Sequence, residues 1–570
     1  MELADRDKLP KAISDSRMLR LQINLQSQNL DNLRKLTEEQ QDPGSPNYHR
    51  WLTRREFRQR FALPKHTLVN LKLWLHSQKF RIIQADQDKI VVEANARLVE
   101  DAFSIHIATS TNGILYASTD DPLFPARFVT AIGSIDGLNN ITQAVPFSRR
   151  LLYPSSGFKP SDFHTFYDEL PLLNAGIMGS DNPLPKPHPK SFCGIAIAAT
   201  SDVPDIAIQW FNNLLLKRSV YQMERVFPDN SNPGRTGDNR ESEALLDVDW
   251  STAVAPGARI RLYISSTLAS AIKGAISDNN CPAIDISYGY CAAAPSLYHD
   301  FDNWFARAAA QGQSVFVSAG DIGSAQLDQR CMPSSTQGVS ELAASQNVVA
   351  VGGTKFAPNL DASGNDVGSV PEQVWQDTGA NGAIISGTGG GKSKIFSKPS
   401  FQTASTPSDS VRDIPDVSFG ASPAYPGFMI YAQHGNNLQL EQWGGTSIAA
   451  PMWAGVSRLI AQAGNTHPKW PNPRLGNMNS IFYKLGPSEA ALGFRDVTVG
   501  NNAFQNVSGY SAVAGYDLAT GWGTVDIATF VNSYKPYVCN PLCPTSMPSP
   551  PVADSKQPAH QQGNRVKLNE

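Results

Sequence analysis

The amino-acid sequence predicts an α/β fold, a parallel sheet covered by helices on both faces, preceded by a smaller α+β unit. Five short apolar segments alternate with amphipathic, helix-like stretches between residues 193 and 353. Strands and helices that alternate in this way form parallel sheets, whose ligands bind beyond the carboxyl ends of the strands. The chain has 570 residues, 41% of them apolar, so it can bury a large core in two or more domains.

The chain before residue 161 predicts the smaller unit and a connection. Residues 1–17 are polar and are expected to be loose, and residues 18–145 are expected to form the α+β unit. Its expected strands cover residues 18–26, 80–86, 89–95 and 103–109, and its expected helices cover 29–41, 54–62 and 66–78. Residues 146–160 are basic and lack periodicity, which predicts an exposed linker and a processing region that proteases can cut.

Residues 161–535 predict the larger unit, whereas the Pro- and Gln-rich residues 536–570 have too few apolar side chains to fold and predict a disordered tail. Strands of the larger unit are expected at 193–200, 259–265, 283–289, 313–320 and 347–353. Helices are expected at 203–217, 239–254, 266–278, 297–311, 338–345 and 447–463.

The composition excludes two classes of partner. A formal net charge of −3 does not favour nucleic acid or an anionic membrane, and no apolar run is long enough to span a bilayer. The charged N-terminus has no apolar signal region. The six cysteines are either buried free thiols or a few disulfides of an exported protein. Cys291 and Cys331 are the favoured pair, because both should lie in loops after neighbouring strands.

The string GGTSIAAP places Ser447 at the start of an apolar helix. Glycines there allow a sharp turn that exposes a serine hydroxyl to a cleft, although an ordinary helix cap can have the same sequence. A serine nucleophile needs a general base. None of the ten histidines lies in a His-Gly-Thr segment at the head of a helix, so a Ser-His-Asp triad is poorly supported.

Carboxyl groups are the alternative base. In ESEALLDVDW, Glu243 and Asp247 lie four residues apart on one helix face, whereas Glu241 and Asp249 point to the other side. Like charges this close raise the pKa of one partner, so the pair can share a proton and act as base and orienter at acid pH. A solvated acidic helix face is the alternative explanation.

Asp321 follows the strand-like SVFVSAG and should lie at a carboxyl end of the sheet. A protonated carboxyl group can donate a hydrogen bond to an oxyanion, which an ionised one cannot do. Asp321 could therefore line an oxyanion hole if burial and neighbouring acids raise its pKa. The alternative is a turn residue that bonds to its own backbone.

Two Gly-rich segments near the C-terminus, FRDVTVGNN and AVAGYDLATGWG, each contain one Asp. Carboxylate and carbonyl oxygens are the ligands that Ca²⁺ prefers. Asp496 and Asp517 are therefore candidate ligands, together with the carbonyl groups of Val497, Val513 and Gly515. Two ordinary turns would explain the same segments.

In order and wording, these strings resemble the sedolisin family of serine-carboxyl peptidases. The matching strings are EALLD (243–247), SAGD (318–321), GGTSIAAP (444–451), DVTVGNN (496–502) and GYDLATGWG (515–523). The early SPNYHRWLTRREF is similar to the activation domain of the kumamolisin-like members.

The resemblance implies a subtilisin-like α/β fold and a ferredoxin-like prodomain, an intramolecular inhibitor that acid releases so that the linker can be cut. It implies an extracellular, monomeric peptidase that acts on peptides or unfolded proteins at acid pH, as an endopeptidase or a tripeptidyl peptidase. Ser447 would form the acyl-enzyme, Glu243 would be the base, Asp247 would orient it and Asp321 would line the oxyanion hole. One Ca²⁺ would bind near the C-terminal end of the catalytic domain.

Two other functions remain open. The first is a catalytically silent peptide-binding protein on the same scaffold, against which the intact set of Ser447, Glu243, Asp247 and Asp321 argues. The second is a neutral Ser-His-Asp hydrolase, which a pH–rate profile rising near the usual histidine pKa of about 6.5 would favour.

Overall fold

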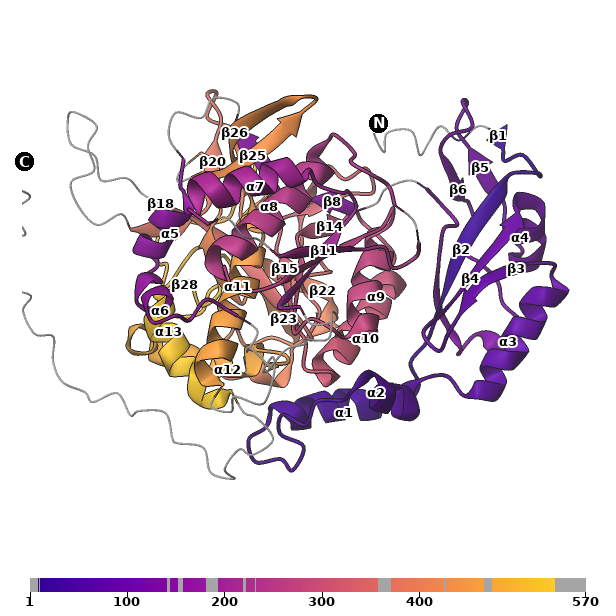
Figure 1. Ribbon diagram of the computed structural model, residues 1–570, viewed down its shortest axis with the longest axis horizontal. Helices are drawn as coiled ribbons and strands as arrows, with labels where there is room; N and C mark the ends of the chain where they lie inside the picture. Colours follow the sequence, from indigo (N-terminus) through magenta and orange to yellow (C-terminus); the bar gives the residue numbers. More distant parts are fainter. Residues whose placement is uncertain are drawn as a thin grey trace, which may run out of the picture.

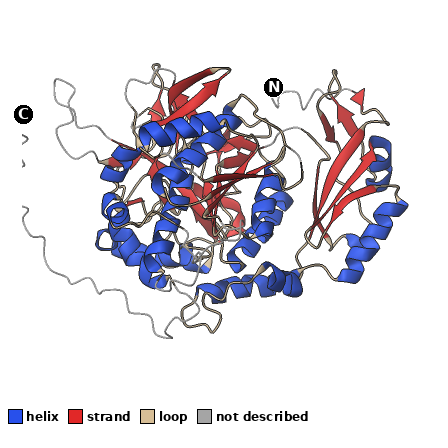
Figure 2. Cartoon of the chain, in the orientation of Figure 1, coloured by secondary structure: helices blue, strands red, loops and turns tan. Residues whose placement is uncertain are grey.

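The computed structural model consists of a smaller N-terminal unit beside a larger unit (Figure 1). It describes residues 9, 11–140, 144–151, 157–180, 193–218, 222–230, 232–356, 371–424, 427–465 and 474–538. Most of the expected loose N-terminus, part of the expected linker and the expected tail from residue 539 onward lie outside the described residues. In the larger unit the strands lie at the centre with helices around them (Figure 2).

The smaller unit contains a four-stranded antiparallel sheet with the order β3-β4-β2-β7 and a separate three-stranded sheet with the order β1-β5-β6. Its elements are β1 (Lys11–Ala12), β2 (Met18–Leu25), α1 (Leu30–Gln41), α2 (Arg54–Phe61), α3 (Lys65–Ser77), β3 (Arg81–Ala85), β4 (Lys89–Asn95), α4 (Ala96–Phe103), β5 (Ile107–Thr109), β6 (Tyr116–Ser118) and β7 (Ile132–Asp136). Helices separate β2 from β3 and β4 from β7, which together with this strand order is the ferredoxin-like arrangement that the resemblance implies.

Two expectations for this unit were wrong in detail. Residues 103–109 were expected to form one strand, but Phe103 ends α4 and only Ile107–Thr109 is extended. The helix forms because the side chain of Asn95 caps it by accepting a hydrogen bond from the amide of Leu98. Residues 1–17 were expected to be loose, but β1 pairs with β5 and the side chain of Ile13 is buried.

The larger unit contains a sheet with the order β11-β12-β10-β13-β15-β18-β19, and β24 also pairs with β18. All pairs are parallel except β18 with β19. The strands are β10 (Ile195–Ala199), β11 (Met223–Val226), β12 (Ile260–Ile264), β13 (Ala283–Ile286), β15 (Ser314–Ser318), β18 (Val349–Phe356), β19 (Glu372–Val374) and β24 (Val417–Gly420).

The helices and the shorter strands of the larger unit complete the fold. The helices are α5 (Pro160–Phe166), α6 (Leu170–Asn174), α7 (Asp205–Trp210), α8 (Asn239–Val254), α9 (Leu268–Asp278), α10 (Pro295–Ala310), α11 (Thr446–Gly464), α12 (Asn479–Leu485) and α13 (Ile527–Tyr534). The shorter strands are β8 (Ala144–Pro146), β9 (Arg149–Leu151), β14 (Tyr288–Tyr290), β16 (Ala325–Leu327), β17 (Pro333–Gln337), β20 (Gln376–Thr378), β21 (Ile384–Gly387), β22 (Gly391–Ser397), β23 (Val411–Ile414), β25 (Phe428–His434), β26 (Asn437–Gly444), β27 (Phe494–Arg495) and β28 (Thr524–Val525). No described helix is both long and apolar enough to span a membrane.

Helices cover both faces of the sheet, as the sequence predicts. Ile195 and Ile197 of β10 pack in the core that contains α8 and α11, whereas Ala196 and Ala198 pack in the core that contains α9 and α10. Both faces of the strand are therefore buried, which explains its unbroken apolar sequence. The helix expected at 338–345 was wrong: the segment makes a single turn, closed by the amide of Ala344 donating to the carbonyl of Ser340.

Two disulfides lie within the described residues. Cys291 pairs with Cys331, which confirms the favoured pair, and Cys193 pairs with Cys281. The pair of Cys193 and Cys281 was not predicted from the sequence. It joins the segments that lead into β10 and β13, two neighbouring strands of the sheet.

The two units touch through apolar and charged contacts. The smaller unit places α1 and α2 against α10, and Leu33, Phe57 and Phe61 share one apolar cluster with Ala306 and Ala310 of that helix (Figure 1). Buried ion pairs and hydrogen bonds surround this cluster. The smaller unit is therefore docked on the helix layer that covers one face of the sheet.

Candidate active site

Ser447 is the second residue of α11, and β26 leads into this helix through Gly445. The backbone of Gly445 has φ 119°, a conformation that side chains strongly disfavour. A Cβ atom there would also overlap the carbonyl oxygen of Phe147 and crowd Oδ2 of Asp321. The sharp turn expected from GGTS is thus present. It buries Ser447, whose Oγ donates to the carbonyl of Ser287 at 3.3 Å.

Glu243 and Asp247 lie on α8, which packs against α11, and both side chains are fully buried. The hydroxyl groups of Ser447 and Ser148 face the carboxyl group of Glu243. Burial raises the pKa of Glu243 well above its usual range and Asp247 raises it further, whereas the two hydroxyl groups lower it. Glu243 therefore faces the serine with Asp247 next to it, and this face of the helix is buried, not solvated.

Asp321 follows β15 and is also fully buried. Its Oδ1 accepts hydrogen bonds from the amide of Thr446 at 2.8 Å and from the Thr446 hydroxyl at 3.0 Å. Among the described residues no donor reaches Oδ2, so this oxygen can carry a proton. Burial raises the pKa of Asp321 to about 7, although Arg149 and Thr446 lower it. The carboxyl group can therefore donate a hydrogen bond at acid pH.

The start of the expected linker occupies this site, which corrects the expectation that residues 146–160 are exposed. Phe147 and Ser148 are only 5% and 4% exposed. β8 runs antiparallel to β14, and the amide of Phe147 donates to the carbonyl of Ser287 at 3.1 Å. On the other side, β9 runs antiparallel to β26. The short extended strands on both sides of Phe147 find backbone partners in the cleft, which outweighs the polar character of the sequence.

The carbonyl oxygen of Phe147 lies at the centre of the site. It accepts a hydrogen bond from the amide of Ser447 at 3.4 Å, and it shares the space beside Gly445 with Oδ2 of Asp321. Two potential donors, one from the backbone and one from a carboxyl group, therefore surround one peptide carbonyl. This is the geometry that an oxyanion hole requires.

The aromatic ring of Phe147 is buried at the carboxyl end of the sheet, where it forms one wall of a small pocket. The ring packs so closely on Gly289 that a Cβ atom there would overlap it. The pocket is lined by Tyr290, Ala292, Tyr298, Ile322, Leu327 and Val339. A large aromatic side chain is therefore accommodated in the core next to the Phe147 carbonyl.

Histidine takes no part in the hydrogen bonds of Ser447 within the described residues. His434 contacts Glu441 at 2.7 Å and His164 contacts the carbonyl of Ala253 at 3.0 Å. The groups that face the serine are carboxyl groups, as the sequence predicts. A further carboxyl group, which was not predicted from the sequence, lies behind them: Asp285 of β13 is fully buried beside Asp247.

The two candidate metal segments lie side by side. The amide of Gly515 donates to Oδ2 of Asp496 at 2.9 Å, and the amide of Val513 donates to Oδ2 of Asp517 at 3.2 Å. Oδ1 of Asp496 is buried and has no donor among the described residues. Burial raises the pKa of Asp496, and raises that of Asp517 to about 6.

The fit of these segments to a hard cation is partial. An unpartnered buried carboxyl oxygen on Asp496 suits a cation, but Oδ1 of Asp517 accepts hydrogen bonds from the amides of Ala519 and Thr520. No cluster of three or more Asp, Glu, His or Cys side chains able to hold a metal occurs in the described part of the chain. A site here would depend on two carboxyl groups and on backbone carbonyls.

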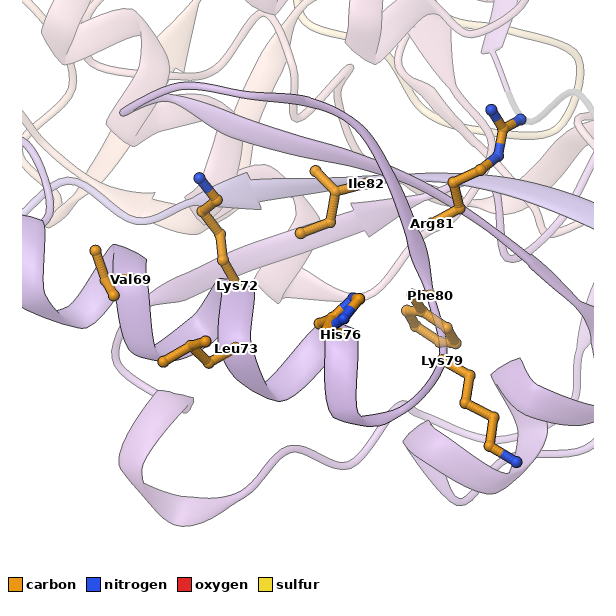
Figure 3. A pocket seen from close by; sticks show the side chains of 8 residues that line it. All are labelled: Val69, Lys72, Leu73, His76, Lys79, Phe80, Arg81 and Ile82. Atoms are coloured by element: carbon orange, nitrogen blue, oxygen red, sulfur yellow. The ribbon is translucent and has the colours of Figure 1, made fainter.

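A second hollow lies on the smaller unit. Residues of α3 and β3 surround a cavity of about 910 Å³ that is lined by Val69, Leu73, Phe80, Ile82 and four basic side chains, Lys72, His76, Lys79 and Arg81 (Figure 3). None of the candidate catalytic residues lines it. This hollow is therefore separate from the candidate active site.

Comparisons with known proteins identify the class of enzyme. A family model described as the pro-kumamolisin activation domain matches residues 8–141. The chain is 30% identical over 525 residues to sedolisin of Pseudomonas sp. (strain 101), covering 87% of this chain and 84% of that protein. It is 33% identical over 324 residues to kumamolisin of Bacillus sp. (strain MN-32), covering 54% of this chain and 53% of that protein.

A solved structure shows the same fold. The chain matches Pseudomonas sedolisin, a serine-carboxyl proteinase complexed with two molecules of pseudo-iodotyrostatin, with a TM-score of 0.53 and 29% identity, covering 67% of this chain and 99% of that chain. Fold and relatives together define a serine-carboxyl peptidase with a subtilisin-like catalytic unit and an activation domain. The chain belongs to the sedolisin family.

Proposed function

We propose that this peptidase cleaves peptide bonds at acid pH through an acyl-enzyme on Ser447. Oγ of Ser447 attacks the carbonyl carbon and passes its proton to Glu243, which then protonates the leaving amine. Asp247 orients Glu243. The oxyanion accepts hydrogen bonds from the amide of Ser447 and from protonated Asp321. Water releases the acyl group by the same steps in reverse order.

We also propose that the first substrate is the chain itself, at the bond between Phe147 and Ser148. The observation that supports this is the position of the Phe147 carbonyl between the amide of Ser447 and Oδ2 of Asp321. Strands on both sides of Phe147 hold it in an extended conformation, as a bound substrate requires. The activation domain therefore acts as an inhibitor that delivers its own linker to the cleft.

The same contacts suggest that other substrates carry a large apolar or aromatic residue before the cleaved bond. The ring of Phe147 is buried against Gly289, and burying an aromatic side chain there stabilises the complex by about 2 kcal/mol. Activity would be lost as the pH rises above about 7, because Asp321, whose pKa is about 7, must stay protonated.

Acid incubation followed by N-terminal sequencing tests this proposal. We expect the full chain to yield a new N-terminus at Ser148 near pH 4, and we expect Ser447→Ala to remain intact. Phe147→Ala should slow the first cleavage or move it, because the buried contacts of the aromatic ring are lost. Full processing and full peptidase activity in Ser447→Ala would refute the assignment of the nucleophile.

We further propose that Asp496 and Asp517, with the carbonyl groups of Val497, Val513 and Gly515, hold one Ca²⁺ that would tie the two C-terminal segments together. The unpartnered Oδ1 of Asp496 supports this. An extracellular location is the remaining proposal, and two disulfides among the described residues support it, because disulfides persist in oxidising compartments.

A further inference from the structure

Asp285 is a buried carboxyl group that the proposed reaction does not use. It lies in β13, a central strand of the sheet between β10 and β15, and its side chain is fully buried. The rest of the strand is apolar, so an acid at this position is unusual. The segment AIDISYG predicts a core strand, and that pattern alone does not mark Asp285 as a functional residue.

Asp285 contacts Asp247 directly. The two carboxyl groups lie within hydrogen-bonding reach of each other, and the hydroxyl group of Ser287 faces both. The same hydroxyl donates to the carbonyl oxygen of Ser447 at 3.2 Å. Asp285 thus lies on the far side of Asp247 from Glu243. Three carboxyl groups, Glu243, Asp247 and Asp285, therefore follow one another from Ser447 into the core.

The surroundings supply no compensating charge. The ionisable groups that face these acids are Glu243 and Asp247 on α8, Asp321 after β15 and the buried Tyr288 on β14. Among the residues that the structure describes, Asp285 and the two acids on α8 form no ion pair, and no hydroxyl or amide donor completes a hydrogen bond to their oxygens.

Such a cluster cannot ionise completely. A buried carboxylate without a partner is costly, and two carboxylates in contact repel each other. One proton held between Asp247 and Asp285 satisfies an oxygen on each side and leaves one negative charge for the pair. The protonated Asp247 donates to ionised Asp285, which fixes the rotation of the Asp247 carboxyl group against Glu243.

We propose that Asp285 is a positioning residue that shares one proton with Asp247 and so holds Asp247 in the orientation that Glu243 needs. This inference rests on the proposed function and deepens it, because it adds a third carboxyl group behind the proposed triad. Asp285 does not touch the peptide in the cleft. Its effect should therefore appear in kcat and in the pH profile, with KM unchanged.

The test is the pH profile of kcat/KM for processed Asp285→Asn on a peptide with an aromatic residue before the cleaved bond. Removing the negative charge of Asp285 makes Glu243 and Asp247 easier to ionise. The acid limb of the profile, in which kcat/KM rises with pH, should therefore move toward lower pH by about one unit. Asp249→Asn is the matched control. It removes another fully buried carboxyl group from α8 that does not couple to Glu243, Asp247 or Asp285, and its profile should overlay the unsubstituted enzyme.

Each outcome decides the inference. A shifted acid limb in Asp285→Asn alone supports it, and an unchanged limb, or a uniform loss of activity at every pH, overturns it. Asp285→Ser serves as a second variant. If both variants unfold at the assay pH, the carboxyl group is needed for folding only and the positioning role is wrong. If Ser447→Ala keeps activity, the proposed function fails; if Ser447→Ala is inactive and the Asp285→Asn profile is unshifted, this inference alone fails.

Discussion

Replacing Asp88 by Asn tests how the activation domain is held on the enzyme. Asp88 lies between β3 and β4 and accepts hydrogen bonds from Arg58 of the same domain and from Arg307 of α10, at 2.8 Å in the latter case. Both Asp88 and Arg307 are buried, and the guanidinium group of Arg307 lies over the ring of Phe57. Burial raises the pKa of Asp88, but Arg307 and Arg58 outweigh burial and hold the pKa at about 2.

The magnitude follows from that pKa. A shift from 3.8 to about 2, at about 1.4 kcal/mol per unit, means that ionised Asp88 stabilises the folded state by about 2 kcal/mol above pH 4. This contribution is lost as the pH falls from about 4 toward 2. Asn also leaves the buried charge of Arg307 unpaired, so we expect a total loss of about 3 kcal/mol at pH 6.

The assay is urea unfolding in the Ser447→Ala background, in which the chain cannot process itself. The control is Asp31→Asn, because Asp31 forms only an exposed pair with Arg34 at 3.8 Å and should contribute less than about 1 kcal/mol. Equal midpoints for Asp88→Asn and the parent at pH 6 would refute the reasoning. Because Asp88 stays ionised to about pH 2, acid release of the domain at pH 3–5 must depend on other groups.

Three further predictions concern the active site and the metal. Glu243→Gln should lower kcat about 10²- to 10⁴-fold at every pH, because the general base is lost; a loss confined to neutral pH in stopped assays would contradict this. Arg149→Ala should let self-processing continue to a slightly higher pH, since Arg149 lowers the pKa of Asp321, and gel-based rates between pH 5 and 8 measure the shift. A chelator should lower the melting temperature of the processed enzyme, and Asp496→Asn should abolish that sensitivity. Calorimetry with and without added Ca²⁺ measures the change, and equal melting temperatures would contradict the proposed site.

Local periodicity was enough to predict much of the fold. The bounds of α8 agree with the expected 239–254, and the facing of Glu243 and Asp247 follows from helix geometry alone. The position of Asp321 next to the start of α11 could be anticipated because parallel strands present their carboxyl ends at one edge of the sheet. These inferences need no knowledge of how distant segments pack.

The features of the site that were missed depend on long-range pairing. Asp285 meets Asp247 only because β13 pairs with β10, the strand against which α8 packs, and a single strand sequence cannot reveal that register. Likewise, Phe147 stands in a polar segment that predicts solvent exposure. Its burial arises from two backbone ladders with β14 and β26, whose partners lie more than 100 residues away.

The antiparallel ladder between β9 and β26 has a consequence for the newly cut enzyme. Cleavage after Phe147 would release the activation domain from its side of the active site. The new N-terminus, which precedes β9, would still lie on the other side. Backbone bonds and the ion pair of Arg150 with Glu441, at 2.7 Å, would keep it there. A longer chain can enter only once this strand lifts away or is trimmed, so freshly activated molecules should pass through a lag before reaching full turnover.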